Sequence, residues 1–168
     1  GSLISCTVTP NDGKTDGTPV VADAVVQNTV PTVTSGSLGS GPYYTYDTIS
    51  ASAVFLDADS EQTLTGLYEW HVIDSSAGSA DLMIQSGNSD LLDGSQFFDK
   101  NDSVYVIVTP NDGVEDGTSL TSVPVSIVNS EPTGITASVI SSDSFYNDST
   151  LTCSATASDA DSEAAVLN

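Results

Sequence analysis

The chain has 168 residues, of which 23 are Asp or Glu and two are Lys, giving a formal net charge of −21 at pH 7. A surface this acidic repels the phosphates of nucleic acids and of anionic membranes, which argues against both as partners. No apolar run approaches the roughly 18 residues of a membrane-spanning helix, and the 7% of aromatic residues favours small cores of aliphatic side chains.

An internal repeat organises the sequence. Residues 9–13 (TPNDG) recur as residues 109–113, and residues 57–61 (DADSE) recur as residues 159–163. The offset is 100 in the first pair and 102 in the second, which is the size of one small β-sandwich domain.

The phase of this repeat predicts three parts. Residues 31–131 make one complete unit. Residues 1–30 correspond to the C-terminal strands F and G of a preceding unit, and residues 132–168 to the N-terminal strands A and B of a following unit. We therefore expect either a segment of a longer array or a subunit whose ends are completed by neighbours.

Apolar and polar side chains alternate with a period of two, which is typical of strands that face a core on one side. Turn residues separate these runs, residues 36–41 beside Pro42 predict a loop, and no segment predicts a helix. An all-β sandwich is therefore the expected fold. In chain order, the rows expected to face inward are Ile4, Cys6 and Val8; Ile49, Ala51, Ala53 and Phe55; Tyr68, Trp70 and Val72; Val104, Val106 and Val108; Val123, Val125 and Ile127; and Leu151, Cys153, Ala155 and Ala157.

The sequence offers little for catalysis. His71 is the single histidine, it follows Trp70 on an expected strand, and we expect it at the surface. No phosphate-binding glycine loop, nucleophile elbow or zinc-binding spacing is present. The paired carboxylates suit glycosidase chemistry, but they recur at expected domain ends, where no cleft is expected. We predict that the chain is not an enzyme.

Three motifs carry a resemblance to a known family: residues 68–70 (YEW), residues 6–13 (CTVTPNDG) and the two DADSE loops. They resemble motifs of the extracellular Ig-like and cadherin-like tandem repeats of bacteria and archaea, over the whole chain. The resemblance implies immunoglobulin-like Greek-key β-sandwich repeats of about one hundred residues, with Trp70 buried between the sheets. It also implies a spacer, adhesin or structural arm in an extracellular or cell-surface protein.

The resemblance also gives the cysteines a role. Cys6 in strand F and Cys153 in strand B take the positions of the inter-sheet disulfide of Ig domains, where the complete unit has Val106 and Ala51. Because the two cysteines belong to different repeats, we expect each to pair with a partner outside these residues, or with the other cysteine of a neighbouring chain. Two buried free thiols are the alternative. Disulfides would suit an oxidising compartment.

The acidic loops predict a cation site at each junction between units. In an Ig-type sandwich the B–C and F–G loops share one end with the incoming linker, here residues 28–30, and carboxylate and amide oxygens are the ligands that Ca²⁺ prefers. Asx turns, a solvated acidic surface, adaptation to high salt and another hard cation are the alternatives. The expected ligands are Asp57, Asp59, Glu61, Asn111, Asp112 and Asp116 at the first junction, and Asn129, Glu131, Asp159, Asp161 and Glu163 at the second.

The leading hypothesis is a structural or adhesive segment whose sandwiches stack end to end and are stiffened by calcium, either beside further repeats or as a filament of identical subunits. The alternative is a carbohydrate- or partner-binding module of an adhesin or large secreted enzyme. Tyr43, Tyr44 and Tyr46 would supply its aromatic platform, although packing at a sheet edge is their competing role. Asn101 and Asn147 lie in N-glycosylation sequons and are candidate sites for sugar.

Overall fold

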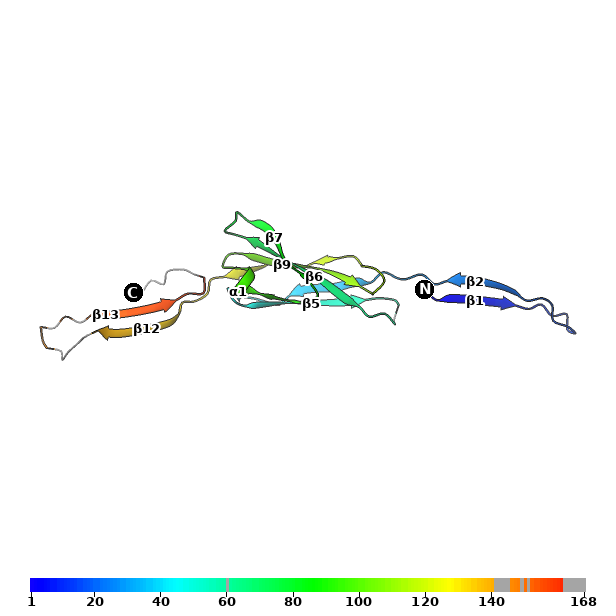
Figure 1. Ribbon diagram of the computed structural model, residues 1–168, viewed down its shortest axis with the longest axis horizontal. Helices are drawn as coiled ribbons and strands as arrows, with labels where there is room; N and C mark the ends of the chain where they lie inside the picture. Colours follow the sequence, from blue (N-terminus) through cyan, green and yellow to red (C-terminus); the bar gives the residue numbers. More distant parts are fainter. Residues whose placement is uncertain (60, 141–145, 149, 151, 162–168) are drawn as a thin grey trace.

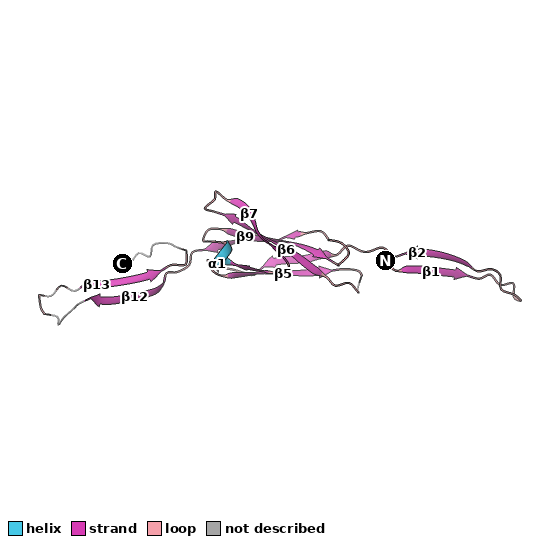
Figure 2. Ribbon diagram, viewed as in Figure 1, coloured by secondary structure: helices cyan, strands magenta, loops and turns pink. Residues whose placement is uncertain are grey.

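The computed structural model describes residues 1–59, 61–140, 146–148, 150 and 152–161. These residues form a central body with a β-hairpin extending from each of its opposite ends (Figures 1 and 2). The expectation of an all-β chain is confirmed, because the one helix of the described residues is the single turn α1 (Gly94–Phe97). None of the helical structure described is long and apolar enough to span a membrane.

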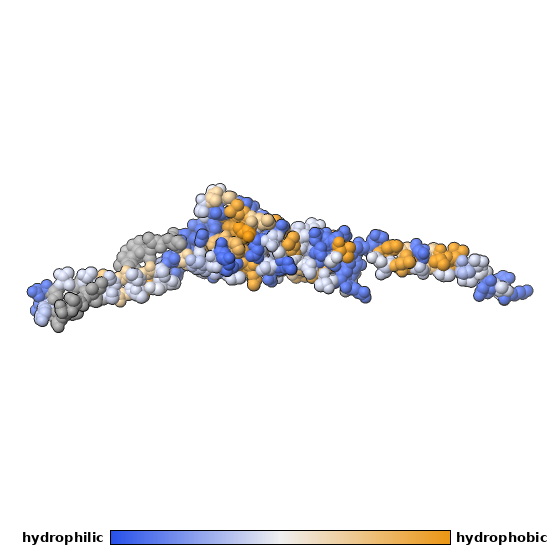
Figure 3. Space-filling view, in the orientation of Figure 1, coloured by the Kyte–Doolittle hydropathy of each residue, from blue (hydrophilic) through white to orange (hydrophobic). Residues whose placement is uncertain are grey.

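The N-terminal hairpin consists of β1 (Leu3–Val8) and β2 (Val20–Val25), which pair antiparallel with Cys6 opposite Ala22. Every residue of both strands is exposed. Figure 3 shows apolar side chains along this hairpin with no other element over them on the visible face.

The central body contains two sheets that face each other. The smaller sheet has the order β3-β5-β8, and the larger has the order β4-β11-β9-β6-β7, with β10 also paired to β9. The strands are β3 (Thr32–Leu38), β4 (Tyr43–Tyr44), β5 (Thr48–Leu56), β6 (Thr65–Asp74), β7 (Ala80–Gly87), β8 (Leu91–Asp93), β9 (Ser103–Asn111), β10 (Leu120–Thr121) and β11 (Val125–Val128).

The core lies between the two sheets. Trp70 of β6 is fully buried at its centre, and its indole Nε1 donates to the carbonyl oxygen of Ser89 at 3.1 Å. The buried apolar residues come from both sheets, as the period-two rows predict. They are Ile49, Ala51, Trp70, Val72, Leu92, Phe98, Val104, Val106, Val108 and Ile127.

Three details of the expected strands were wrong. Ile4, Cys6 and Val8 do not face a core, because no described element covers β1 and all of its residues are exposed. Residues 36–38 belong to β3 and not to a loop. Val123 does not face the core but is 82% exposed, because the last strand is interrupted between β10 and β11. Ser122 is buried there instead, and its hydroxyl accepts a hydrogen bond from the backbone N–H of Val106 at 3.1 Å.

The C-terminal hairpin consists of β12 (Thr133–Ile140) and β13 (Thr152–Ser158), which pair antiparallel with Ala137 opposite Ala155. The sequence repeat places β12 and β13 in correspondence with β3 and β5, and β1 and β2 in correspondence with β9 and the β10–β11 segment. The N-terminal hairpin therefore corresponds to the last strands of the body, and the C-terminal hairpin corresponds to its first strands.

Candidate functional site

The N-terminal hairpin is attached to the body through the loop that follows β5. The backbone N–H of Thr29, in the linker after β2, donates to Oδ2 of Asp59 at 2.7 Å. The N–H of Asp59 itself donates to Oδ1 of Asp57 at 2.6 Å. This short Asx turn fixes the loop, so that the Asp59 carboxylate is held where the linker passes.

A single amide side chain connects the same linker to two loops of the body. Asn28 Nδ2 donates to Oδ2 of Asp112 at 2.9 Å and to Oε1 of Glu115 at 3.3 Å. Asn28 Oδ1 accepts from Nε2 of Gln62 at 2.6 Å. Asn28 is half-buried, whereas the other residues of 1–30 are exposed. We call the following residues the first joint: Asn28, Thr29, Asp57, Asp59, Gln62, Asp112 and Glu115.

Asp112 is the buried acid of the first joint. Its Oδ1 accepts from the backbone N–H groups of Val114 at 2.7 Å and Glu115 at 2.8 Å, which closes the turn after β9. The Glu115 N–H and then the Asn28 amide hold the pKa of Asp112 below its ordinary value, because both stabilise the carboxylate form. Asp112 therefore stays ionised and orients Asn28.

The C-terminal hairpin is attached through an equivalent set of bonds. The backbone N–H of Ser130 donates to Oδ2 of Asp161 at 2.6 Å, and the N–H of Asp161 donates to Oδ1 of Asp159 at 2.8 Å. Oδ1 of Asp161 also accepts from the hydroxyl groups of Thr45 at 2.5 Å and Ser130 at 3.1 Å. We call the following residues the second joint: Thr45, Lys100, Asn129, Ser130, Asp159 and Asp161.

The acceptor of the second joint lies beside buried hydroxyl groups. Thr45 and Ser130 are buried, and burial raises the pKa of Asp161. The hydrogen bonds from Thr45 and Ser130, with the positive charge of Lys100, outweigh that effect and hold the pKa below its ordinary value. Lys100 Nζ also donates to Oδ1 of Asn129 at 3.1 Å, which adds a contact between the body and the linker.

Both joints use an Asp carboxylate as the acceptor of a linker N–H group. Hydrogen bonds to charged groups contribute about 1.5–3 kcal/mol each, roughly twice the contribution of neutral ones. A linker that would otherwise rotate freely is thereby held against the loop that follows it. The arrangement can therefore position neighbouring parts of the chain, because it fixes the direction of each linker relative to the loop that it contacts.

The structure brings the expected cation ligands together only in part. Asp57, Asp59 and Asp112 belong to the first joint, and Asn129, Asp159 and Asp161 to the second. Asn111 Nδ2 instead donates to Oδ1 of Asp116 at 2.7 Å within the turn after β9. Glu61 and Glu131 are exposed, Asn129 contacts Lys100, and Glu163 lies outside the described residues. In the described part of the chain, no three His, Cys, Asp or Glu side chains are grouped to hold a metal ion.

Two acceptor atoms in the first joint are buried without a hydrogen-bond partner among the described residues. They are Oδ2 of Asp57 and Oε1 of Gln62. Buried polar atoms are nearly always paired with protein, water or an ion. These two atoms therefore mark the part of the joint with spare capacity for a ligand.

The sequence indicated the acids of the joints but not their neutral partners. Asn28, Thr45, Gln62 and Ser130 are ordinary polar residues whose contacts depend on the fold. One signal was present: residues 28–31 (NTVP) and 129–132 (NSEP) share the pattern Asn, Thr or Ser, any residue, Pro at an offset of 101. This repetition marks both linkers.

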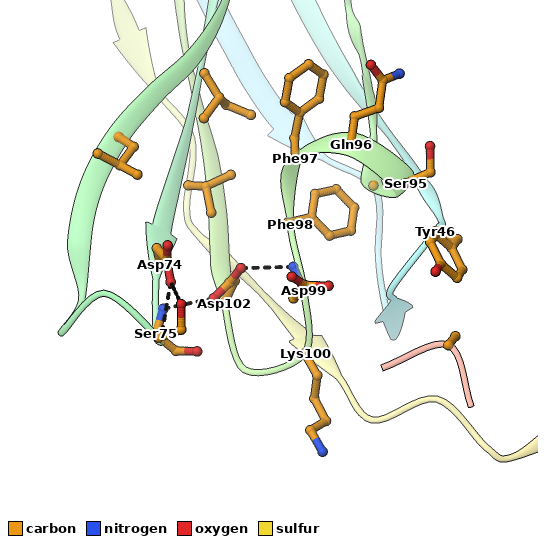
Figure 4. Close-up of a pocket in the computed structure, with 16 residues that line it drawn as sticks. Tyr46, Asp74, Ser75, Ser95, Gln96, Phe97, Phe98, Asp99, Lys100 and Asp102 are labelled. Carbon is orange, nitrogen blue, oxygen red and sulfur yellow. Dashed lines mark hydrogen bonds between the residues drawn. The ribbon is translucent and has the colours of Figure 1, made fainter. Parts of the chain in front are cut away.

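A pocket of about 300 Å³ opens beside the second joint, between the β6–β7 hairpin and α1 (Figure 4). Its lining includes the apolar side chains of Val72, Leu82, Ile84, Phe97 and Phe98. Asp102 lies at its edge, is buried, and accepts from the backbone N–H groups of Ser75 at 2.8 Å and Asp99 at 2.9 Å. Because both oxygens hold backbone segments in place, this carboxylate has a structural role.

His71 belongs to a polar cluster on the opposite face of β6 from the core. Its ring stacks on that of Tyr105, with centroids 4.7 Å apart and an interplanar angle of 17°. Asp81 contacts both, accepting from the Tyr105 hydroxyl at 2.7 Å and lying 3.0 Å from Nδ1 of His71. The hydrogen bond to Asp81 raises the pKa of Tyr105 to about 12. The three residues link β6, β7 and β9 across the sheet.

The remaining candidate residues lie apart from the joints. Cys6 and Cys153 are exposed free thiols on the two hairpins, so neither is buried in this structure. Tyr43 and Tyr44 form the edge strand β4, and Tyr46 is 59% exposed and lines the pocket. Asn101 and Asn147, the two sequon residues, are exposed.

Comparison of the chain with protein-family models, with curated proteins and with solved structures finds no match. The function is therefore argued from the joints, the body and the hairpins themselves.

Proposed function

We propose that this chain is a structural, non-catalytic segment of an extracellular or cell-surface repeat protein, in which immunoglobulin-like sandwiches follow one another and are aligned by carboxylate joints. The observation that carries the proposal is the recurrence of one bond. Thr29 N–H to Asp59 and Ser130 N–H to Asp161 join equivalent residues at the two ends of the body, at 2.7 and 2.6 Å.

The arrangement of the body supports the immunoglobulin-like part of the proposal. Strands lettered A, B and E in that fold would be β3, β5 and β8, and strands G, F, C and C′ would be β11, β9, β6 and β7. Two such sheets, with a buried Trp on strand C, are typical of immunoglobulin domains. Trp70 on β6 takes that position. The equivalence of each hairpin to part of the body supports the tandem arrangement.

Calcium at the joints is a further part of the proposal. Oδ2 of Asp57 is buried without a partner among the described residues and lies in the same loop as Asp59. A hard cation bound between these carboxylates would supply that partner and offset their mutual repulsion. Since hydrogen bonds already close the joint, the cation would tighten it further.

A binding role in adhesion is the second candidate. The pocket in Figure 4 favours it, because apolar side chains such as those of Phe97 and Phe98 share its lining with polar groups, and ligand sites combine the two kinds. Tyr46 at the rim would supply an aromatic contact. Glycan-array binding that is lost in Tyr46→Ala would favour this role over a purely structural one.

The structural proposal is tested by measuring how firmly the C-terminal hairpin is held to the body. A spin label on the exposed Cys153 and a second on Ser86→Cys, in a Cys6→Ser background, report the distance between hairpin and body. We expect a narrow distance distribution that broadens in Asp161→Ala. Asp148→Ala, which removes an exposed acid of the same hairpin, is the matched control. Equal widths in all three proteins would contradict an aligning role for the joint.

A further inference from the structure

The N-terminal hairpin exposes a surface whose equivalent in the body is core. Ile4 and Val8 are 59% and 61% exposed, whereas Val104 and Val108, one hundred residues later, are 0% and 1% exposed. Figure 3 shows apolar patches along this hairpin. An apolar face of this kind marks a surface that another element covers.

The body shows what covers the equivalent surface. Val106 of β9 and Ala51 of β5 lie in one core, contributed by opposite sheets. The residues that correspond to this pair are Cys6 in β1 and Cys153 in β13. The C-terminal hairpin is therefore equivalent to the element that covers β9, but within one chain it lies at the far end of the body (Figure 1).

A second contact of the body is also reproduced in the two hairpins. Thr32, at the start of β3, forms a parallel bridge with Thr118, and a Cβ atom on Gly117 would lie 1.9 Å from the carbonyl oxygen of Pro31. Glycine is therefore required where β3 enters. The equivalent residues are all of the same type: Pro132 and Thr133 on the C-terminal hairpin, and Gly17 and Thr18 on the N-terminal hairpin.

We propose that hairpin β12–β13 of one copy of this chain docks on hairpin β1–β2 of a second copy. The contact repeats between copies the packing of β5 on β9 and the entry of residues 31–32 beside residues 117–118. The partner of the structural segment proposed above is thus a second copy of the same chain, and this inference rests on that proposed function. Because each copy uses two different surfaces, the association is head-to-tail and continues as a filament.

The cysteines fit the needs of this interface. The two hairpins correspond to β9 with the β10–β11 segment and to β3 with β5, so the docked pair reproduces a part of the core to which Trp70, on β6, does not belong. Small cores of this kind are commonly stabilised by disulfides. Cys6 and Cys153 correspond to Val106 and Ala51, which belong to one core and to opposite sheets, so docking brings the two thiols into the same interface from opposite sides.

The covalent step is an ordinary thiol–disulfide exchange. Cys6 of one copy and Cys153 of the other lose two protons and two electrons and form one S–S bond. A low-molecular-weight disulfide such as oxidised glutathione takes up those electrons and protons and leaves as two thiols. Docking comes first, and the disulfide then locks it.

The test uses the 168-residue chain with oxidised glutathione and non-reducing electrophoresis. We expect a ladder of covalent oligomers from the parent chain. Cys6→Ser and Cys153→Ser should each give no ladder alone, and an equimolar mixture of them should give a dimer whose linked peptides contain Cys6 of one variant and Cys153 of the other. A parent that stays monomeric, or that forms mainly Cys6–Cys6 or Cys153–Cys153 links, would overturn the proposal.

Docking without the disulfide is measured by sedimentation of the reduced chain over a concentration series. Ile4→Asp places a charge in the proposed interface and should weaken association at least about tenfold, because a buried charge without a partner is costly. Leu3→Asp, on the opposite face of the same strand, is the matched control and should associate like the parent. Equal association of the two variants would overturn the proposal. The distance distribution between the spin labels tests the joints separately, because the labelled protein lacks Cys6 and its Cys153 is blocked by a label. Failure of docking would leave that result unchanged.

Discussion

The backbone N–H of Ser130 donates to the carboxylate of Asp161, which lies 31 residues further along the chain, at 2.6 Å. Thr29 and Asp59 make the same connection 30 residues apart. In both cases the acid belongs to the unit that follows the linker. In the array proposed above, each unit would therefore carry the acceptor for the linker before it, and each added unit would add a joint.

We expect the second joint to loosen in acid. The folded-state pKa of Asp161 lies below its ordinary value, so the carboxylate favours the closed joint above about pH 3.9, the pKa of an unperturbed Asp. That contribution is lost as the pH falls through the lower folded-state value. The label distance between Cys153 and Ser86→Cys should broaden over that range. Asp161→Asn should give a width that does not change there, and a parent width that stays constant would contradict this account.

Removing the bridging amide should open the first joint. Asn28→Ala leaves Asp112 Oδ2 and Gln62 Nε2 without the partner they have now, and we expect a cost of about 1–2 kcal/mol in local closing. Hydrogen exchange of the Thr29 amide should accelerate by roughly ten-fold. Gln27→Ala, one residue earlier and exposed, should leave that rate unchanged. Similar acceleration in both variants would show that Asn28 has no special part in the joint.

Much of the fold was predictable because it depends on local alternation. Val104, Val106 and Val108 occupy every second position of β9 and are buried, whereas the residues between them are half-buried, and a strand with one buried face imposes that period. The exceptions have local physical causes. Pro124 has no N–H group to donate to a sheet, and the strand is interrupted around it, between β10 and β11. The residue that is buried there is therefore Ser122 and not Val123. Residues 36–38, rich in Gly and Ser, join β3 because β5 pairs with them.

Only the acidic residues of the joints were predictable from the sequence. Asp59 and Asp161 were indicated by repetition, whereas the role of their partners depends on where the chain passes in space. Thr45 shows the difficulty, since it lies 116 residues from Asp161 and its hydroxyl contact arises from the fold alone. Carboxylates also satisfy backbone N–H groups efficiently, so an acidic loop does not by itself distinguish a cation site from a set of turns.

Asp102 should contribute strongly to the stability of the body. Asp102→Ala leaves the backbone N–H groups of Ser75 and Asp99 without their acceptor, and we expect a loss of about 2–4 kcal/mol in the free energy of unfolding. In urea denaturation, the variant should unfold at a lower midpoint, and the slope of the unfolding free energy against urea concentration should not change. Asp99→Ala removes an exposed side chain of the same segment and should cost far less. Equal midpoints would refute the structural role of Asp102.

The His71 cluster should make the stability of the body sensitive to alkali. Because the hydrogen bond to Asp81 raises the pKa of Tyr105 to about 12, the neutral phenol contributes stability that is complete below about pH 10 and is lost as the pH rises through the higher value. Absorbance titration should show Tyr105 ionising late, together with Tyr68, whose pKa is also raised by burial and by the charge of Asp90. Asp81→Asn should bring Tyr105 toward the ordinary range, and a titration curve identical to that of the parent would refute the assignment.

Calcium should act at the first joint through Asp57. We expect binding of about millimolar affinity, the range of extracellular modules, with heat measurable by titration calorimetry. Asp57→Asn removes one charge from the loop whose buried Oδ2 has no partner in the described structure, and should weaken binding severalfold. Asp116→Asn removes the same charge from an exposed residue that contacts Asn111 outside the joint, so it should bind as the parent does. If both variants bind alike, the cation associates with the general acidic surface. If no heat appears at several times the millimolar level, hydrogen bonds alone close the joint.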